Sequence, residues 1–211
     1  MHYFIVFLEL SGVVAASVSG AMTAMKKRMD IFGVMILGLI TAVGGGVIRD
    51  ITLGITPPAT FRNPMYALTA VVTAVVVFLP CVQRLFRRYQ RVYDFVLLTM
   101  DSIGLGIFTV VGVNTGISHG YVDYMFLLVF LGTITGVGGG LLRDIMAGVP
   151  PYILVRHIYA CASIVGAIVC VVLYRNFGAV VSMVGASAVV ILVRYLAAHY
   201  RWNLPKLTRE E

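Results

Sequence analysis

Long stretches without a charged residue recur along this chain and fix the environment in which it can fold. Residues 64–83 and 124–142, for example, contain no Asp, Glu, Lys or Arg. About 20 helical residues cross the roughly 30 Å hydrocarbon core of a bilayer. Hydrophobic residues make up 60% of the chain and charged residues only 12%, whereas soluble domains are about half apolar and one-quarter charged. The sequence therefore predicts an integral membrane protein.

Seven such stretches predict an all-α, multi-pass membrane protein with seven transmembrane helices in a single membrane domain, residues 1–211. The first stretch contains one acid, Glu9, and the fourth contains one, Asp101. The last stretch is extended past Arg194, whose long stem can reach the membrane interface. The expected spans are residues 4–25, 31–48, 64–83, 95–118, 124–142, 157–174 and 177–193, with the seventh helix continuing to 199 and a cytoplasmic tail over 200–211.

The distribution of basic residues predicts the orientation. With the N-terminus outside, 13 of the 16 Lys and Arg fall in the inner segments, and an excess of Lys and Arg marks cytoplasmic segments. We therefore expect the N-terminus out and the C-terminus in. The net charge of +7 follows from this topology. Basic residues that only separate apolar spans exclude a nucleic-acid surface, although the inner clusters can contact anionic membrane lipids.

The chain also repeats itself. The motif Gly-Gly-Gly-x-x-Arg-Asp occurs at 44–50 and again at 138–144, an offset of 94, and an offset of 92 carries Glu9 onto Asp101. The repeat thus relates three spans in residues 4–83 to three spans in residues 95–174, with the seventh helix outside it. Because three is odd, the second unit is expected to be inverted in the membrane.

The glycine triplets are the first candidate site, and two interpretations are open. Inverted repeats place broken helices at the bilayer midplane, where their backbone serves a solute or ion. Each glycine weakens a helix by about 1 kcal/mol relative to alanine, so the triplets predict a break or kink. The alternative is close helix packing through small residues. The candidate positions are Gly44, Gly45, Gly46, Gly138, Gly139 and Gly140.

The charged pairs that follow the triplets are the second candidate site. Neighbouring residues on a helix do not face each other, so the aspartates are expected to pair elsewhere, with Arg62 and Arg156 as candidates. At least one arginine per repeat is expected to line a pore or vestibule. Glu9 and Asp101, in the first helix of each unit, are secondary candidates that pair with an arginine or attract cations. The pairs themselves are Arg49, Asp50, Arg143 and Asp144.

No enzyme, metal or cofactor chemistry is expected. The three cysteines, Cys81, Cys161 and Cys170, are an odd number and lack the spacing of metal ligands. The spans contain no constellation of nucleophile and base, of metal ligands or of paired acids at usable spacing.

Several segments together resemble one family. They are Arg-Met-Asp-Ile-Phe-Gly-Val at 28–34, Thr-Ala-Val-Gly-Gly-Gly at 41–46, Thr-Gly-Val-Gly-Gly-Gly at 135–140 and Ile-Tyr-Ala at 158–160. The chain resembles the prokaryotic branch of the trimeric intracellular cation channel family, which is also described as a glycine transporter family. One difference is that related first helices carry an aromatic residue where this chain reads Ala-Ser-Val-Ser-Gly at 16–20; Phe108 retains it in the second repeat.

The resemblance implies a bacterial inner-membrane homotrimer. Each subunit would enclose its own pore, with the second and fifth helices kinked at the triplets and potassium as the main permeant ion. Two functions remain open. One is a passive monovalent cation channel, and the other is a secondary carrier for glycine or a similar small zwitterion, whose two charges an arginine and an acid would bind.

Overall fold

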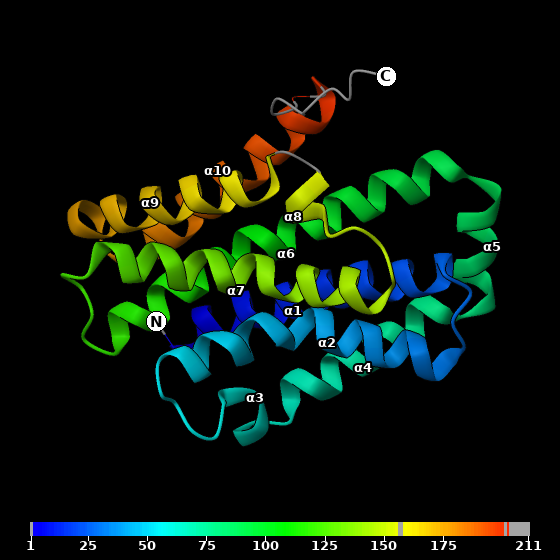
Figure 1. Cartoon of the computed structure of the whole chain (residues 1–211), viewed down its shortest axis with the longest axis horizontal. Helices are drawn as coiled ribbons and strands as arrows, with labels where there is room; N and C mark the ends of the chain where they lie inside the picture. The colour runs from blue at the N-terminus through cyan, green and yellow to red at the C-terminus, as the bar shows by residue number, and fades with distance from the viewer. Residues whose placement is uncertain (1, 156–157, 201, 203–211) are drawn as a thin grey trace, which may run out of the picture.

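The structure, a computed structural model, describes residues 2–155, 158–200 and 202. Over these residues the chain forms ten helices and no strand, which confirms the all-α membrane fold (Figure 1). In chain order the helices are α1 (His2–Lys26), α2 (Ile31–Thr52), α3 (Ala59–Arg62), α4 (Met65–Phe78), α5 (Pro80–Arg88), α6 (Gln90–Ser118), α7 (Met125–Met146), α8 (Tyr152–Val155), α9 (Tyr159–Phe177) and α10 (Ala179–His199).

Six helices, α1, α2, α6, α7, α9 and α10, are each long and apolar enough to cross a membrane. The third expected span is different, because α4 ends at Phe78 and α5 leaves it at a bend of 64°. Pro80 is the cause: a residue before proline is driven out of the helical region, and Leu79 has an extended backbone with ψ 143°. The expected single helix over 64–83 is therefore wrong, and seven spans result only when α4 and α5 count as one.

The helices group as the internal repeat leads one to expect. Helices α1, α2 and α4 pack on one another, and so do α6, α7 and α9. The two groups meet where α2 packs against α7 and α1 against α6, while α10 lies against α6 and α9 (Figure 1). The inverted relation of the two units and their boundaries stay predictions, as does the orientation of the termini.

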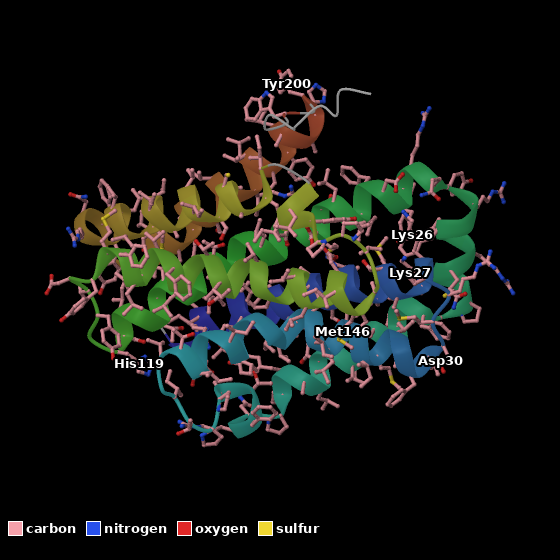
Figure 2. The ribbon with its side chains drawn as sticks, in the orientation of Figure 1. Lys26, Lys27, Asp30, His119, Met146 and Tyr200 are labelled. Atoms are coloured by element: carbon pink, nitrogen blue, oxygen red, sulfur yellow. The ribbon has the colours of Figure 1, made fainter. Side chains whose placement is uncertain are left out.

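The two ends of the helix bundle carry different residues. Figure 2 shows Lys26, Lys27 and Asp30 at one end and His119 at the other. At the first end α1 ends at Lys26, and two residues later Arg28 has a left-handed backbone with φ 57°. Asp30 then caps α2 by accepting a hydrogen bond from the backbone N–H of Gly33 at 2.8 Å. A short, defined turn therefore joins α1 to α2.

Candidate functional site

The two glycine triplets lie where α2 and α7 pack against each other. A Cβ added at Gly45 would come closer than 3.0 Å to the backbone oxygen of Thr135, and one added at Gly139 equally close to that of Thr41. Backbone therefore contacts backbone at both positions. Both helices run through their triplets without interruption, so the expected break is wrong; a kink within a continuous helix stays a prediction. Close packing through small residues describes the contact.

Each arginine that follows a triplet binds the aspartate next to it. Arg49 Nε donates to Asp50 Oδ1 at 2.8 Å, and Arg143 Nε donates to Asp144 Oδ1 at 2.8 Å. The expectation that adjacent residues would seek other partners is therefore wrong. The long, flexible arginine side chain can bend round to the side chain of the next residue, so the contact does not need the two residues to share a helix face.

The second oxygen of each aspartate holds a backbone N–H across the following turn. Asp50 Oδ2 accepts from the N–H of Ala59 at 2.8 Å, and Asp144 Oδ2 accepts from the N–H of Tyr152 at 2.7 Å. Each aspartate thus joins its arginine to the first residue of a short helix, α3 or α8. The matching geometry shows that the repeated Arg-Asp motif builds the same local structure twice.

The predicted partner Arg62 does not bind an aspartate. It is exposed, and its guanidinium donates to the backbone oxygen of Thr56 at 2.8 Å. This prediction is wrong, because Asp50 is already bound by its own neighbour and by Ala59. The corresponding residue of the second unit, Arg156, lies outside the residues that the structure describes.

In the second unit, buried charged groups gather around Asp101. Arg143 Nη1 lies 2.6 Å from Asp101 Oδ1 and also donates to the hydroxyl of Ser19. Arg194 Nη2 lies 3.6 Å from Asp101 Oδ2, with its guanidinium 4.7 Å from the centroid of the Tyr159 ring. The exposed fractions of Arg143, Asp101 and Arg194 are 0%, 6% and 4%. We call Asp101, Arg143, Asp144 and Arg194 the charged cluster.

Arg194 therefore does not extend to the interface as expected. Unpaired burial of a charge is costly, and Asp101 supplies the opposite charge that makes burial tolerable. The cluster contains two acids and two arginines, so its formal charge is zero. Its hydrogen bonds are incomplete: Asp101 Oδ2, Arg143 Nη2 and Arg194 Nε have no hydrogen-bond partner among the described residues.

Two cavities lie beside the glycine contact, with matching residues around them. The first has a volume of about 60 Å³ and is lined by Glu9, Gly46, Arg49 and Tyr66 among others. The second has a volume of only about 10 Å³, near the size of one water molecule. Its lining includes the counterparts of three of these residues, namely Asp101, Gly140 and Tyr159. Phe108 contributes to the lining of both cavities.

The first cavity has a different charge from the cluster beside the second. Glu9 accepts a hydrogen bond from the Tyr66 hydroxyl and forms no ion pair with any described residue, since Arg49 is bound to Asp50. Glu9, Asp50 and Arg49 together carry a formal charge of −1. The first cavity is thus the larger, and the charged residues that line it or bind its lining sum to −1, whereas those around Asp101 beside the second cavity sum to zero.

Three residues that contribute to this site, Tyr66, Tyr159 and Arg194, are not among those predicted from the sequence. A signal for the tyrosines was present, since an offset of 93 relates Tyr66 to Tyr159 in the third helix of each unit. Arg194 gives no such signal, because α10 has no counterpart in the repeat.

Comparisons with known proteins agree with this architecture. A family model described as "Glycine transporter" matches residues 6–80 and 98–175, one stretch in each unit. The inner membrane protein YadS of Escherichia coli, a UPF0126 protein, is 39% identical over 163 residues, which are 77% of this chain and 75% of that protein.

Solved structures are similar over almost the whole chain. A TRIC cation channel is 34% identical with a TM-score of 0.81, and the alignment covers 97% of this chain and 98% of that one. The trimeric intracellular cation channel orthologue from Rhodobacter sphaeroides is 32% identical with a TM-score of 0.84, covering 94% and 99%. The fold and the inner-membrane location expected from the sequence are thereby confirmed.

Proposed function

Because the chain belongs to the family of prokaryotic TRIC cation channels, which is also described as a glycine transporter family, we propose that it is a passive monovalent cation channel with potassium as the main permeant ion. Each subunit holds one pathway, which passes between α2 and α7 through the two cavities. The subunits assemble as a homotrimer, because the similar channel from Rhodobacter sphaeroides is a trimeric one.

The uncompensated carboxylate of Glu9 in the first cavity is the observation that carries this proposal. Carboxylates at the mouth of a pore raise the local concentration of cations. The basic residues nearby do not cancel this effect, because Arg49 is already neutralised by Asp50 at 2.7 Å. The first cavity therefore favours a cation over an anion or an uncharged solute.

The structure corresponds to a closed conformation of the proposed pathway. The second cavity has a volume of only about 10 Å³, too small for a hydrated ion. Asp101, the counterpart of Glu9, is bound there by two arginines. No carboxylate is free there to attract an ion. Opening of the pathway must separate part of the charged cluster. Three polar atoms of the cluster lack a hydrogen-bond partner among the described residues, and an incompletely bonded buried network is less stable than a complete one. The free-energy cost of separating the cluster is therefore lowered.

Transport of glycine is the second candidate, because Glu9 and Arg49 line the same cavity. A zwitterion needs one group of each charge, and these two residues would supply them. Arg49 would then have to leave Asp50. This requirement makes the carrier the weaker alternative.

One preparation tests both functions. Purified protein is placed in a planar bilayer with a potassium gradient, and in liposomes with labelled glycine outside. Unitary, ohmic potassium currents without glycine accumulation are expected. Saturable, gradient-coupled uptake of glycine without unitary currents would contradict the channel and support the carrier.

Neutralising Glu9 is expected to weaken the preference for cations. The change Glu9→Gln removes one charge from the first cavity, worth about 1 kcal/mol, or about fivefold in potassium conductance, at low salt. Near 1 M salt, where the Debye length is about 3 Å, the difference should largely disappear. Single-channel conductance measured against potassium concentration gives the result.

The control for this variant is Asp123→Asn. Asp123 is an exposed carboxylate in the turn between α6 and α7, at the same end of the bundle as Glu9. Its loss should leave conductance almost unchanged at every salt concentration. Equal effects of the two variants would show that general surface charge, and not the first cavity, attracts the ion.

Removing the charge of Arg194 is expected to favour the open channel. After Arg194→Gln the charged cluster carries a charge of −1, as Glu9, Asp50 and Arg49 together do in the first unit, and Asp101 keeps Arg143 as its partner. A charge-assisted contact contributes about 1.5 kcal/mol, so the equilibrium constant for opening should rise about tenfold. Open probability in planar bilayers measures it. Arg175→Gln, at the exposed end of α9, is the control, and an unchanged open probability in both variants would exclude Arg194 from gating.

A further inference from the structure

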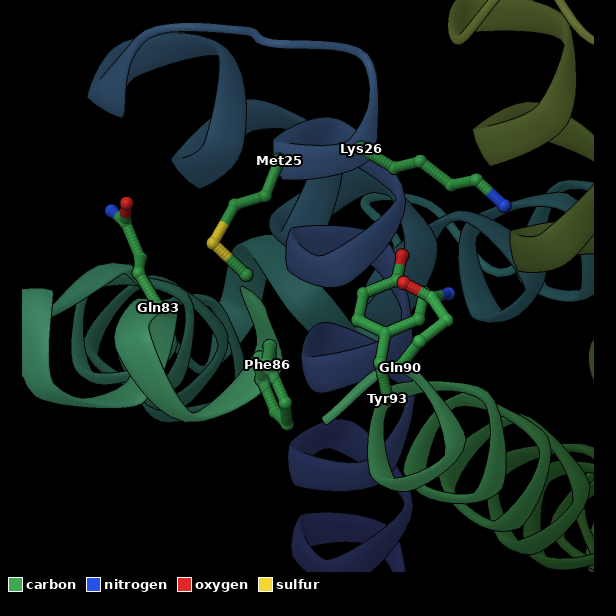
Figure 3. A pocket seen from close by; sticks show the side chains of 6 residues that line it. All are labelled: Met25, Lys26, Gln83, Phe86, Gln90 and Tyr93. Atoms are coloured by element: carbon green, nitrogen blue, oxygen red, sulfur yellow. The ribbon is translucent and has the colours of Figure 1, made fainter. Parts of the chain in front are cut away.

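A second pair of cavities, far from the ion pathway, lies where α4 ends and α5 turns away. One has a volume of about 190 Å³ and the other about 630 Å³, and they share Met25, Lys26 and Gln83 in their linings. Figure 3 shows the side chains of the first around the space between the end of α1, α5 and the beginning of α6. The combined size is that of sites that bind whole small molecules.

The length of α4 explains why this space exists. Its 14 residues rise about 21 Å, which is less than the roughly 30 Å core of a bilayer. The 64° bend turns α5 away from the direction of α4, and α5 faces the end of α1 and the beginning of α6 across the first cavity (Figure 3). Because α4 is too short to cross the whole core, we expect the cavities to lie near the level where lipid headgroups meet acyl chains.

The lining has an apolar part and a cationic part. Met25, Phe86, Met29 and Phe78 supply apolar surface. Two cations, Lys26 and Arg28, line the space, and neither forms an ion pair with any described residue. The lining residues include no acid. The site thus offers positive charge above an apolar wall.

The other polar groups of the lining are already bound. Gln83 Nε2 donates to the backbone oxygen of Phe78 at 2.6 Å, Tyr93 O–H donates to the backbone oxygen of Met22 at 2.9 Å, and Gln90 Nε2 donates to Asp94 at 3.2 Å. These hydrogen bonds hold the side chains of Gln83, Tyr93 and Gln90 in place around the cavity. Lys26 and Arg28 are left as the groups that can bind an anion.

We propose that this cavity, between the end of α1, α5 and the beginning of α6, binds one anionic phospholipid. Its phosphate contacts Lys26 and Arg28, and the first part of an acyl chain lies against Met25, Phe78 and Phe86. Charge complementarity favours an anionic lipid over a zwitterionic one, because two cations face the site without an acid. The concentration of Lys and Arg in the α1–α2 connection and in α5 places the cavity in the expected cytoplasmic leaflet, where anionic lipids attract basic segments.

The test is native mass spectrometry of the full-length protein in mild detergent with phosphatidylglycerol or phosphatidylcholine of the same acyl chains. We expect one phosphatidylglycerol per subunit to be retained under conditions that remove phosphatidylcholine. sn-Glycerol 3-phosphate at the same concentration should not displace it, because it lacks the acyl chain. Equal retention of both lipids, or displacement by the soluble phosphate, would overturn the proposal.

Two matched pairs of variants separate a defined site from diffuse attraction. Lys26→Gln is expected to weaken phosphatidylglycerol binding about tenfold, the value of one charge-assisted hydrogen bond. Lys27→Gln makes the same charge change at the next exposed residue, outside the lining, and should have a clearly smaller effect. Equal losses would overturn the proposal.

The second pair leaves the charge unchanged. Gln90→Trp places a large side chain in the cavity and should abolish phosphatidylglycerol binding, whereas Tyr89→Trp, at an exposed neighbour outside the lining, should not. Potassium currents report folding of all four variants, because these positions lie away from both cavities of the ion pathway. Undiminished binding to a Gln90→Trp protein that still conducts would overturn the proposal.

Discussion

Replacing Gly45 or Gly139 with alanine is expected to destroy the packing of α2 against α7. The added methyl group would meet a backbone oxygen at less than 3.0 Å, that of Thr135 or of Thr41. A flexible side chain could move aside, but a helix backbone moves only if the two helices separate. Overpacking costs about 1–3 kcal/mol where side chains absorb it, so we expect a loss of about 3 kcal/mol or more, with little folded protein and no potassium current.

The same triplet supplies the control. A Cβ at Gly46 would meet only Arg49 Nη2, at 3.9 Å, so Gly46→Ala should leave the fold intact. Helix propensity favours alanine by up to about 1 kcal/mol, and a slightly raised melting temperature is the expected result. Thermal denaturation of the purified proteins, followed by size-exclusion chromatography, compares the three variants. Equal damage from Gly46→Ala and Gly45→Ala would show that glycine is needed for backbone flexibility and not for close contact.

Neutralising Asp101 is the second change with a large expected effect. Asp101→Asn leaves Arg143 and Arg194 buried with Asp144 as the remaining carboxylate, so the charged cluster carries +1. Breaking a buried ion pair by removing one partner costs about 3–5 kcal/mol. We expect a fall of that size in the free energy of unfolding, measured by denaturation of the detergent-solubilised protein. Asp94→Asn, an exposed change on the same helix, should cost less than about 1 kcal/mol.

A double variant shows whether charge is the cause. Asp101→Asn with Arg194→Gln leaves Arg143 and Asp144, a neutral pair joined at 2.8 Å. Stability should recover by about half or more of the loss, since contacting residues are not additive. A double variant less stable than Asp101→Asn alone would mean that the shape of the cluster, and not its charge balance, stabilises this region.

The sequence predicted the spans because their signal is local. Uncharged runs fix five of the seven spanning helices to within about four residues, and a sixth, α6, begins five residues before the expected span. The third span was predicted as one helix because Pro80 lies within an uncharged run, and the absence of charge cannot show a bend. Pro80 itself is the local signal of the bend, since a proline disfavours a helical backbone at the residue before it.

The candidate site was predicted only in part, because its contacts join distant segments. The repeat identified Glu9, Asp101, Arg49 and Arg143 as matching positions. In the structure Glu9 and Arg49 line the first cavity, Asp101 lines the second, and Arg143 binds Asp101. It did not predict that Asp101 binds Arg143 and Arg194, since those bonds depend on how α6, α7 and α10 pack. The rule for facing residues also failed for Arg49 and Asp50, because it describes helix surfaces and not the reach of a long side chain.

Arg194 makes the two repeat units different from each other. Two identical inverted units would present the same face to an ion arriving from either side of the membrane. Among the described residues, however, only the second unit contacts α10, and only its acid, Asp101, gains a second arginine. The seventh helix therefore makes the two units chemically unequal, because the carboxylate of Glu9 has no ion-pair partner there and that of Asp101 has two. In the channel proposed above, ions that enter from opposite sides would meet these two environments in opposite order.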